Sequence, residues 1–112
     1  MAADKLFVYG SLQPGGPNEH VLDAIGGTFE PASVRGRLLE AGWGASLGYP
    51  GLVLDQDGPR IEGYLFTAAT LDQHWPALDD FEGEAYERVS TPVTLADGTT
   101  TEASLYVLRE PA

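Results

Sequence analysis

The chain has 112 residues, of which 43% are hydrophobic, and seventeen acidic against six basic side chains give it a formal charge of −11. This length predicts a single domain spanning residues 1–112, and the composition excludes general disorder. Because so negative a surface repels phosphate groups, nucleic acids and anionic membranes are not expected as partners.

The lack of cysteine and the lack of long apolar segments indicate the cellular compartment in which the protein is expected to work. The sequence contains no cysteine, so disulfide bonds and thiolate catalysis are excluded. Residues 1–5 lack the apolar stretch of a signal peptide, and no apolar run approaches the roughly 18 residues of a membrane-spanning helix. We therefore expect a cytoplasmic protein.

The first third of the chain predicts a strand, a loop and a helix. Residues 6–9 form a short apolar run that Gly10 ends, which is typical of a buried strand. Residues 11–17 are rich in proline and glycine and must form a loop. Asn18 can cap a helix whose apolar face carries Val21, Leu22 and Ile25, and glycines follow it.

The middle of the chain predicts three strands, at residues 33–39, 52–54 and 60–66. The first and third contain an internal glycine, Gly36 and Gly63, which indicates a bend or bulge. Residues 41–51 hold four glycines and are interpreted as an irregular loop. Residues 55–58 read as a turn.

The last part predicts a second helix and a hairpin. Thr70 can cap a helix with Leu71, Trp75 and Leu78 inward, and Pro76 must kink or restart it. The helix should end near residues 79–83. Residues 88–95 and 100–108 then flank a strong turn signal at residues 97–98.

The predicted elements amount to about six short strands and two helices. Glycines inside strands favour a strongly bent sheet, because a missing side chain lets backbones approach closely. The sequence therefore predicts an α+β fold, with the sheet partly closed into a barrel.

The glycine-rich loop after the first strand is one candidate site. Residues 9–16 contain three glycines and a serine but no lysine, so they do not match a phosphate-binding loop. Their backbone N–H groups could still meet an anion or a polarised carbonyl. An ordinary strand-to-helix turn also explains the pattern. Ser11 has no histidine in a triad context, and the two histidines do not have the spacing of a metal site.

The segment at residues 78–88 is the second candidate site. It holds five carboxylates within eleven residues. Carboxylates this close raise one another's pKa values, and a carboxyl tuned in this way can move protons near neutral pH. A solvated acidic helix end in an acidic protein is the alternative.

Several segments together resemble the gamma-glutamylcyclotransferase-like family, also called AIG2-like, which includes the gamma-glutamylamine cyclotransferases. They are residues 9–12 (Tyr-Gly-Ser-Leu), 17–22, 48–53 (Gly-Tyr-Pro-Gly-Leu-Val), 61–63, 78–83 (Leu-Asp-Asp-Phe-Glu-Gly) and 86–88. The resemblance covers nearly the whole chain, in order. It implies a small mixed β-barrel with two flanking helices. Gln13 and Tyr64 depart from the basic residue and the glutamate that many members carry there.

The resemblance also implies an activity and a site. The expected reaction is attack of a substrate α-amine on its own gamma-amide carbonyl, which gives 5-oxoproline and a free amine. Glu82 is the expected general acid and base. Tyr9, Gly10, Ser11, Leu12 and Tyr86 are the expected substrate-binding residues.

No metal or cofactor is expected, and the protein is expected to act as a monomer on a small gamma-glutamyl compound. Two alternatives remain open: a binding module of the same fold without catalysis, and removal of a gamma-glutamyl protecting group in a biosynthetic pathway.

Overall fold

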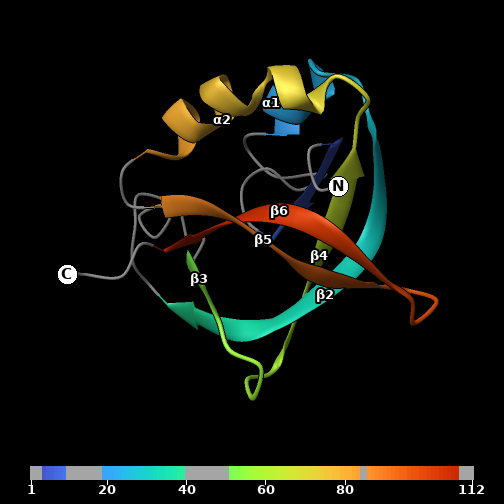
Figure 1. Cartoon of the computed structure of the whole chain (residues 1–112), viewed down its shortest axis with the longest axis vertical. Helices are drawn as coiled ribbons and strands as arrows, with labels where there is room; N and C mark the ends of the chain where they lie inside the picture. The colour runs from blue at the N-terminus through green and yellow to red at the C-terminus, as the bar shows by residue number, and fades with distance from the viewer. Residues whose placement is uncertain (1–3, 10–18, 40–50, 84–85, 109–112) are drawn as a thin grey trace.

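The computed structural model describes residues 4–9, 19–39, 51–83 and 86–108 (Figure 1). The six strands are β1 (Lys5–Val8), β2 (Thr28–Leu39), β3 (Gly51–Leu54), β4 (Arg60–Thr67), β5 (Tyr86–Leu95) and β6 (Thr100–Leu108). The helices are α1 (Glu19–Asp23) and α2 (Trp75–Glu82), and the short 3-10 helix η3 (Leu71–Gln73) lies directly before α2. Among these residues, no helix has the length and apolar character that a membrane crossing requires.

Five of the strands close into a barrel. The strand order is β3-β2-β4-β1-β6-β5, and a further pairing between β2 and β5 closes the ring, which leaves β3 as an extra strand beside β2. That closing ladder is short, with Ala32 opposite Leu95 and Ser33 opposite Thr94. Only β1 and β6 run parallel among the described pairs. The predicted fold, a small mixed β-barrel with two helices, is confirmed.

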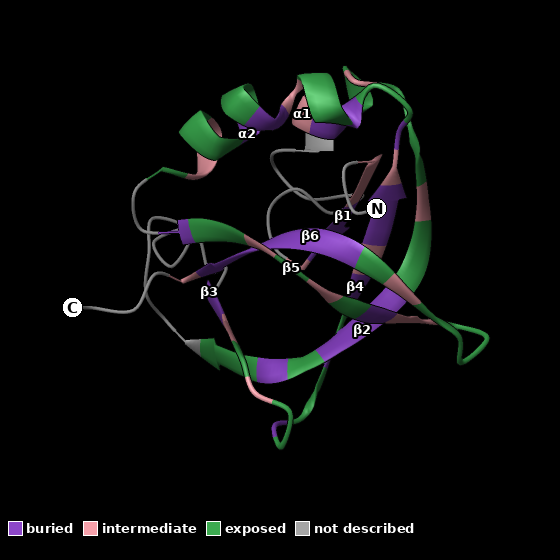
Figure 2. Ribbon diagram, in the orientation of Figure 1, coloured by how far each residue is buried: buried purple, intermediate pink, exposed green. Residues whose placement is uncertain are grey.

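Side-chain alternation along the strands builds two apolar clusters. Phe7 of β1 packs inside the barrel with Leu105 and Val107 of β6. Leu6 and Val8 point the other way, because successive side chains of a strand face opposite sides. They pack with Tyr106 and with the buried face of the helices, which carries Leu22, Leu71, Trp75 and Leu78 (Figure 2).

The second predicted helix is divided in two. The helix was expected to begin at a Thr70 cap, but that side chain makes no capping hydrogen bond and only η3 follows it. Pro76 has no N–H to donate to the preceding turn, so the α-helix restarts at Trp75 with the proline in its first turn. Of the two outcomes expected for Pro76, the restart is the one observed.

The strand β2 is longer than its local pattern indicated. β2 begins at Thr28, five residues before the predicted start, because Phe29 pairs with Phe66 in the ladder with β4.

The internal Gly63 of β4 lies where a Cβ atom would collide with the carbonyl oxygen of Val8. Gly63 therefore permits the close approach of β1 and β4 in the bent sheet.

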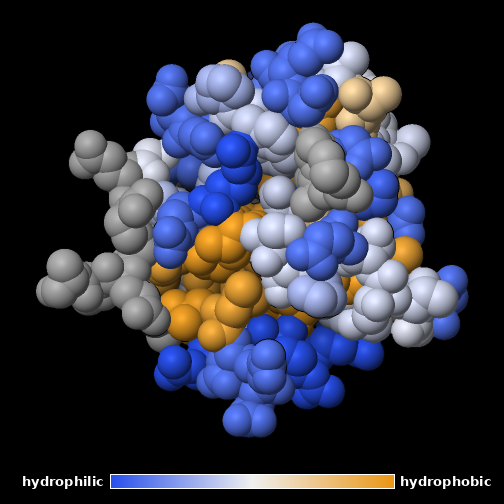
Figure 3. Space-filling view, in the orientation of Figure 1, coloured by the Kyte–Doolittle hydropathy of each residue, from blue (hydrophilic) through white to orange (hydrophobic). Residues whose placement is uncertain are grey.

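One face of the molecule carries an apolar surface (Figure 3). Among the described residues, the exposed large hydrophobic side chains are Leu38 of β2 and Leu54 of β3, which are 43% and 36% exposed. They flank the buried Leu52, which pairs with Leu38. Because Leu52 belongs to the apolar cluster inside the barrel, the apolar surface at β3 is continuous with that cluster.

Candidate functional site

Glu82 is the last residue of α2, and the local sequence fixes where that helix stops. Gly83 follows with φ 82° and ψ −174°, a conformation that is essentially restricted to glycine, and its N–H bonds to the Asp79 carbonyl at 3.0 Å. The inward side chains Trp75 and Leu78 hold this helix against the barrel. The carboxyl of Glu82 is thereby carried to the junction between α2 and β5.

The Glu82 side chain is half-buried, and this burial raises the pKa of its carboxyl from 4.5 to about 7. Desolvation disfavours the charged form of an acid. Repulsion between neighbouring carboxylates was the expected cause, and that explanation is wrong, because burial accounts for the shift.

Tyr9 joins three strands at one end of the barrel. Its hydroxyl donates a 2.7 Å hydrogen bond to the Tyr106 carbonyl oxygen in β6 and accepts a 3.1 Å hydrogen bond from the Leu52 N–H in β3. Burial raises the pKa of Tyr9, and the charges of Glu82 and Tyr86 raise it further. Tyr9, Glu82 and Tyr86 are therefore electrostatic neighbours, although Tyr9 follows β1 and the other two lie in α2 and β5.

The structure describes three of the six predicted site residues, namely Tyr9, Glu82 and Tyr86. Tyr86 is buried at the first position of β5, where it pairs with Leu108. Gly10, Ser11 and Leu12 lie outside the described residues, so their role remains a prediction. Among the described residues, no three histidines, cysteines or carboxylates gather in the manner of a metal site.

Tyr106 was not selected from the sequence, but it lies beside these residues. Its hydroxyl donates a 2.7 Å hydrogen bond to Oδ1 of Asp79, and Nη1 of Arg88 lies 3.4 Å from the same oxygen. Burial and the hydrogen bond to Asp79 raise the pKa of Tyr106, and the charge of Glu82 contributes in the same direction. The available signal was a tyrosine in an otherwise apolar run of a C-terminal strand.

A surface pocket of about 560 Å³ opens beside the end of α2. It is lined by Asp79, Asp80, Gly83, Tyr86, Glu87, Arg88 and Tyr106. Among the described lining residues, Tyr86 is the one predicted from the sequence as a site residue. It lies in this pocket beside Tyr106, Asp79 and Arg88.

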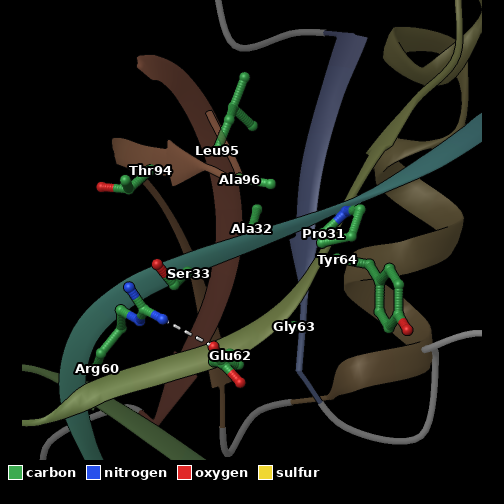
Figure 4. Close-up of a pocket in the computed structure, with 10 residues that line it drawn as sticks. All are labelled: Pro31, Ala32, Ser33, Arg60, Glu62, Gly63, Tyr64, Thr94, Leu95 and Ala96. Atoms are coloured by element: carbon green, nitrogen blue, oxygen red, sulfur yellow. Dashed lines mark hydrogen bonds and ion pairs between the residues drawn. The ribbon is translucent and has the colours of Figure 1, made fainter. Parts of the chain in front are cut away.

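A second pocket, of about 390 Å³, lies where β2 and β5 close the barrel (Figure 4). Arg60 and Glu62 form an ion pair of 3.0 Å in its wall. Its described lining includes none of the predicted site residues.

Comparison with known proteins gave one family and a set of similar structures. The family model described as "Gamma-glutamyl cyclotransferase, AIG2-like" matches residues 6–112. No curated protein matches the chain. An AIG2-like protein from Mus musculus (A2LD1, GGACT) is similar, with a TM-score of 0.68 and 27% identity over 97% of this chain and 79% of that one.

Two further structures share the fold. YkqA from Bacillus subtilis has a TM-score of 0.73 and 28% identity over 95% of this chain, which spans 36% of that protein's length. At5g39720.1 from Arabidopsis thaliana has a TM-score of 0.72 and 24% identity, over 97% of this chain and 70% of that one.

Proposed function

This chain belongs to the gamma-glutamyl cyclotransferase family of AIG2-like proteins, and on that premise we propose that it is a cyclotransferase acting on a gamma-glutamyl amide. The substrate is a small molecule with a free α-amine and an amide at its side-chain carbonyl. The products are 5-oxoproline and a free amine. The monomeric protein needs no cofactor for this reaction.

Glu82 is the general acid and base of the proposed mechanism. As a carboxylate it removes a proton from the substrate α-ammonium. The freed nitrogen attacks the gamma carbonyl, so that the new ring C–N bond forms and the original amide C–N bond breaks. Protonated Glu82 then returns this proton to the leaving amide nitrogen. The ring nitrogen carries one proton too many after the attack, and Glu82 passes that second proton to the released amine, which leaves as an ammonium ion. Water is not consumed, and the atoms and charges balance.

The observation that carries this proposal is the half-buried carboxyl of Glu82, with its pKa near 7. A group of this kind is both deprotonated and protonated at substantial fractions near neutral pH, as a proton shuttle requires. Its place beside Tyr9 and Tyr86 supports the assignment, since both residues are expected to bind substrate.

The carbonyl oxygen becomes negative as the ring closes. We assign its stabilisation to the backbone N–H groups of Gly10, Ser11 and Leu12, on the sequence prediction. A single donor of this kind is typically worth about 3 kcal/mol in the transition state. Tyr9 orients the substrate from the neighbouring end of β1.

The experiment incubates the protein with gamma-glutamyl dipeptides and gamma-glutamyl amines and measures 5-oxoproline by mass spectrometry. N-acetylated forms of the same compounds are the substrate control, because their blocked amine cannot close the ring whereas a simple amidase would still cleave them. We expect 5-oxoproline from the free-amine donors only.

Two variants test the assigned residue. Glu82→Gln removes the proton shuttle and should lower the rate by about a hundredfold or more. Asp80→Asn makes the matching change at an exposed carboxylate of the same helix and should keep the activity. If no donor gives 5-oxoproline while the folded protein still binds such compounds, the chain is a binding module and the proposal fails.

A further inference from the structure

Three contacts join α2 to the strands β5 and β6. Oδ1 of Asp79 accepts the Tyr106 hydroxyl hydrogen bond at 2.7 Å and pairs with Arg88 at 3.4 Å. The guanidinium of Arg88 also lies 4.5 Å from the centre of the Trp75 ring. Trp75 and Asp79 are one turn apart on the same face of α2. Arg88 of β5 therefore holds this helix at two successive turns.

Glu82 lies three residues beyond Asp79, so the two carboxyls are neighbours on the helix surface. The contacts that fix Asp79 therefore also fix the backbone that carries Glu82. Tyr106 connects the two residues from the side of the barrel, because it bonds to Asp79 and is influenced by the charge of Glu82.

From this geometry we infer that Asp79 and Arg88 are positioning residues, a charge-compensated pair that holds the last turn of α2 and sets the orientation and proton affinity of Glu82. The consequence for catalysis rests on the proposed function. The effect on the Glu82 proton does not, and it can be measured without substrate.

The charges explain why both members of the pair are needed. An uncompensated Asp79 carboxylate so near to Glu82 would disfavour its ionisation, whereas an uncompensated Arg88 would favour it. The other described groups near this region are the hydroxyls of Tyr9 directly after β1, Tyr86 on β5 and Tyr106 on β6. The carboxylates of Asp80 on α2 and Glu87 on β5 also line the pocket beside Asp79. Burial raises the pKa values of Tyr9 and Tyr106, so both stay uncharged near neutral pH.

The test is an NMR titration of the Glu82 side-chain carboxyl in the full chain. Asp79→Asn should lower the Glu82 pKa and Arg88→Gln should raise it, each by about half a unit to one unit. The double variant should titrate close to the wild type. The exposed pair Arg60–Glu62 gives matched controls, since Arg60→Gln and Glu62→Gln should leave Glu82 unchanged.

A merely structural role would lower stability without moving the pKa in opposite directions. Shifts of the same sign, or no shift, in folded variants would therefore overturn the inference. If Arg88→Gln does not fold, Asp79→Asn decides alone: a lowered pKa supports the inference, and an unchanged or raised one overturns it. If wild type makes no 5-oxoproline, the proposed function fails while the titration still tests the pair.

Discussion

The hydroxyl of Tyr9 donates a hydrogen bond of 2.7 Å to the backbone carbonyl of Tyr106, a residue 97 positions later in the sequence. The same hydroxyl accepts the N–H of Leu52, so a single side chain ties β1, β6 and the extra strand β3 together. A contact between residues near the two ends of the chain therefore stabilises the end of the barrel next to Glu82.

Tyr9→Phe should lower the free energy of unfolding by about 1–2 kcal/mol, because it leaves the partly buried N–H of Leu52 without its acceptor. Urea denaturation monitored by circular dichroism measures this change. Tyr64→Phe is the matched control, since the Tyr64 hydroxyl has no hydrogen bond to the described part of the chain. An equal loss in both variants would contradict the role given to the Tyr9 hydroxyl.

The rate of cyclisation should depend on the ionisation of Glu82. Because burial raises its pKa to about 7, the carboxylate that must accept a proton is lost as the pH falls below that value. We expect kcat/KM to rise with pH and to bend near 7. A bend near 4.5, the ordinary value for this carboxyl, would show that it is solvated in the working protein.

Stability should follow the opposite trend. The folded protein binds the Glu82 proton more tightly than the unfolded chain, so the contribution of Glu82 to stability is greatest below pH 4.5 and falls as the pH rises toward 7. Glu82→Gln has no such charge to bury and should be more stable than wild type at pH 8, by at most about 3 kcal/mol. This advantage should disappear at pH 4, and a constant difference across the pH range would argue against a buried carboxylate.

Gly83→Ala should affect both stability and activity. An alanine would strain the backbone at φ 82° and ψ −174°, at a cost of about 1–3 kcal/mol, and would shift the end of α2 that carries Glu82. Gly98→Ala is the control, because Gly98 also has a positive φ, of 87°, but lies in the turn between β5 and β6. Both variants should unfold at lower urea concentration, and only Gly83→Ala should lower kcat/KM in the folded protein.

Local residues predict much of this fold. The Asp97–Gly98 pair produces the tight turn of the last hairpin, where the N–H of Gly98 bonds to the Leu95 carbonyl at 3.0 Å. Pro76 starts a helix, and Gly83 ends it directly after Glu82. These residues act through their own backbone preferences, so the order and type of the elements follow from the sequence alone.

The pairing of strands that are distant in the sequence could be learned only from the three-dimensional structure. Alternation along β1 tells which side chains share a face, but not that β1 runs parallel to β6 or that β2 closes the ring against β5. The sequence also presented Glu82 as one of several clustered carboxylates. Its raised pKa comes from desolvation, which depends on how distant segments pack around a side chain. The expectation from the sequence, that neighbouring carboxylates cause the shift, therefore named the wrong physical cause.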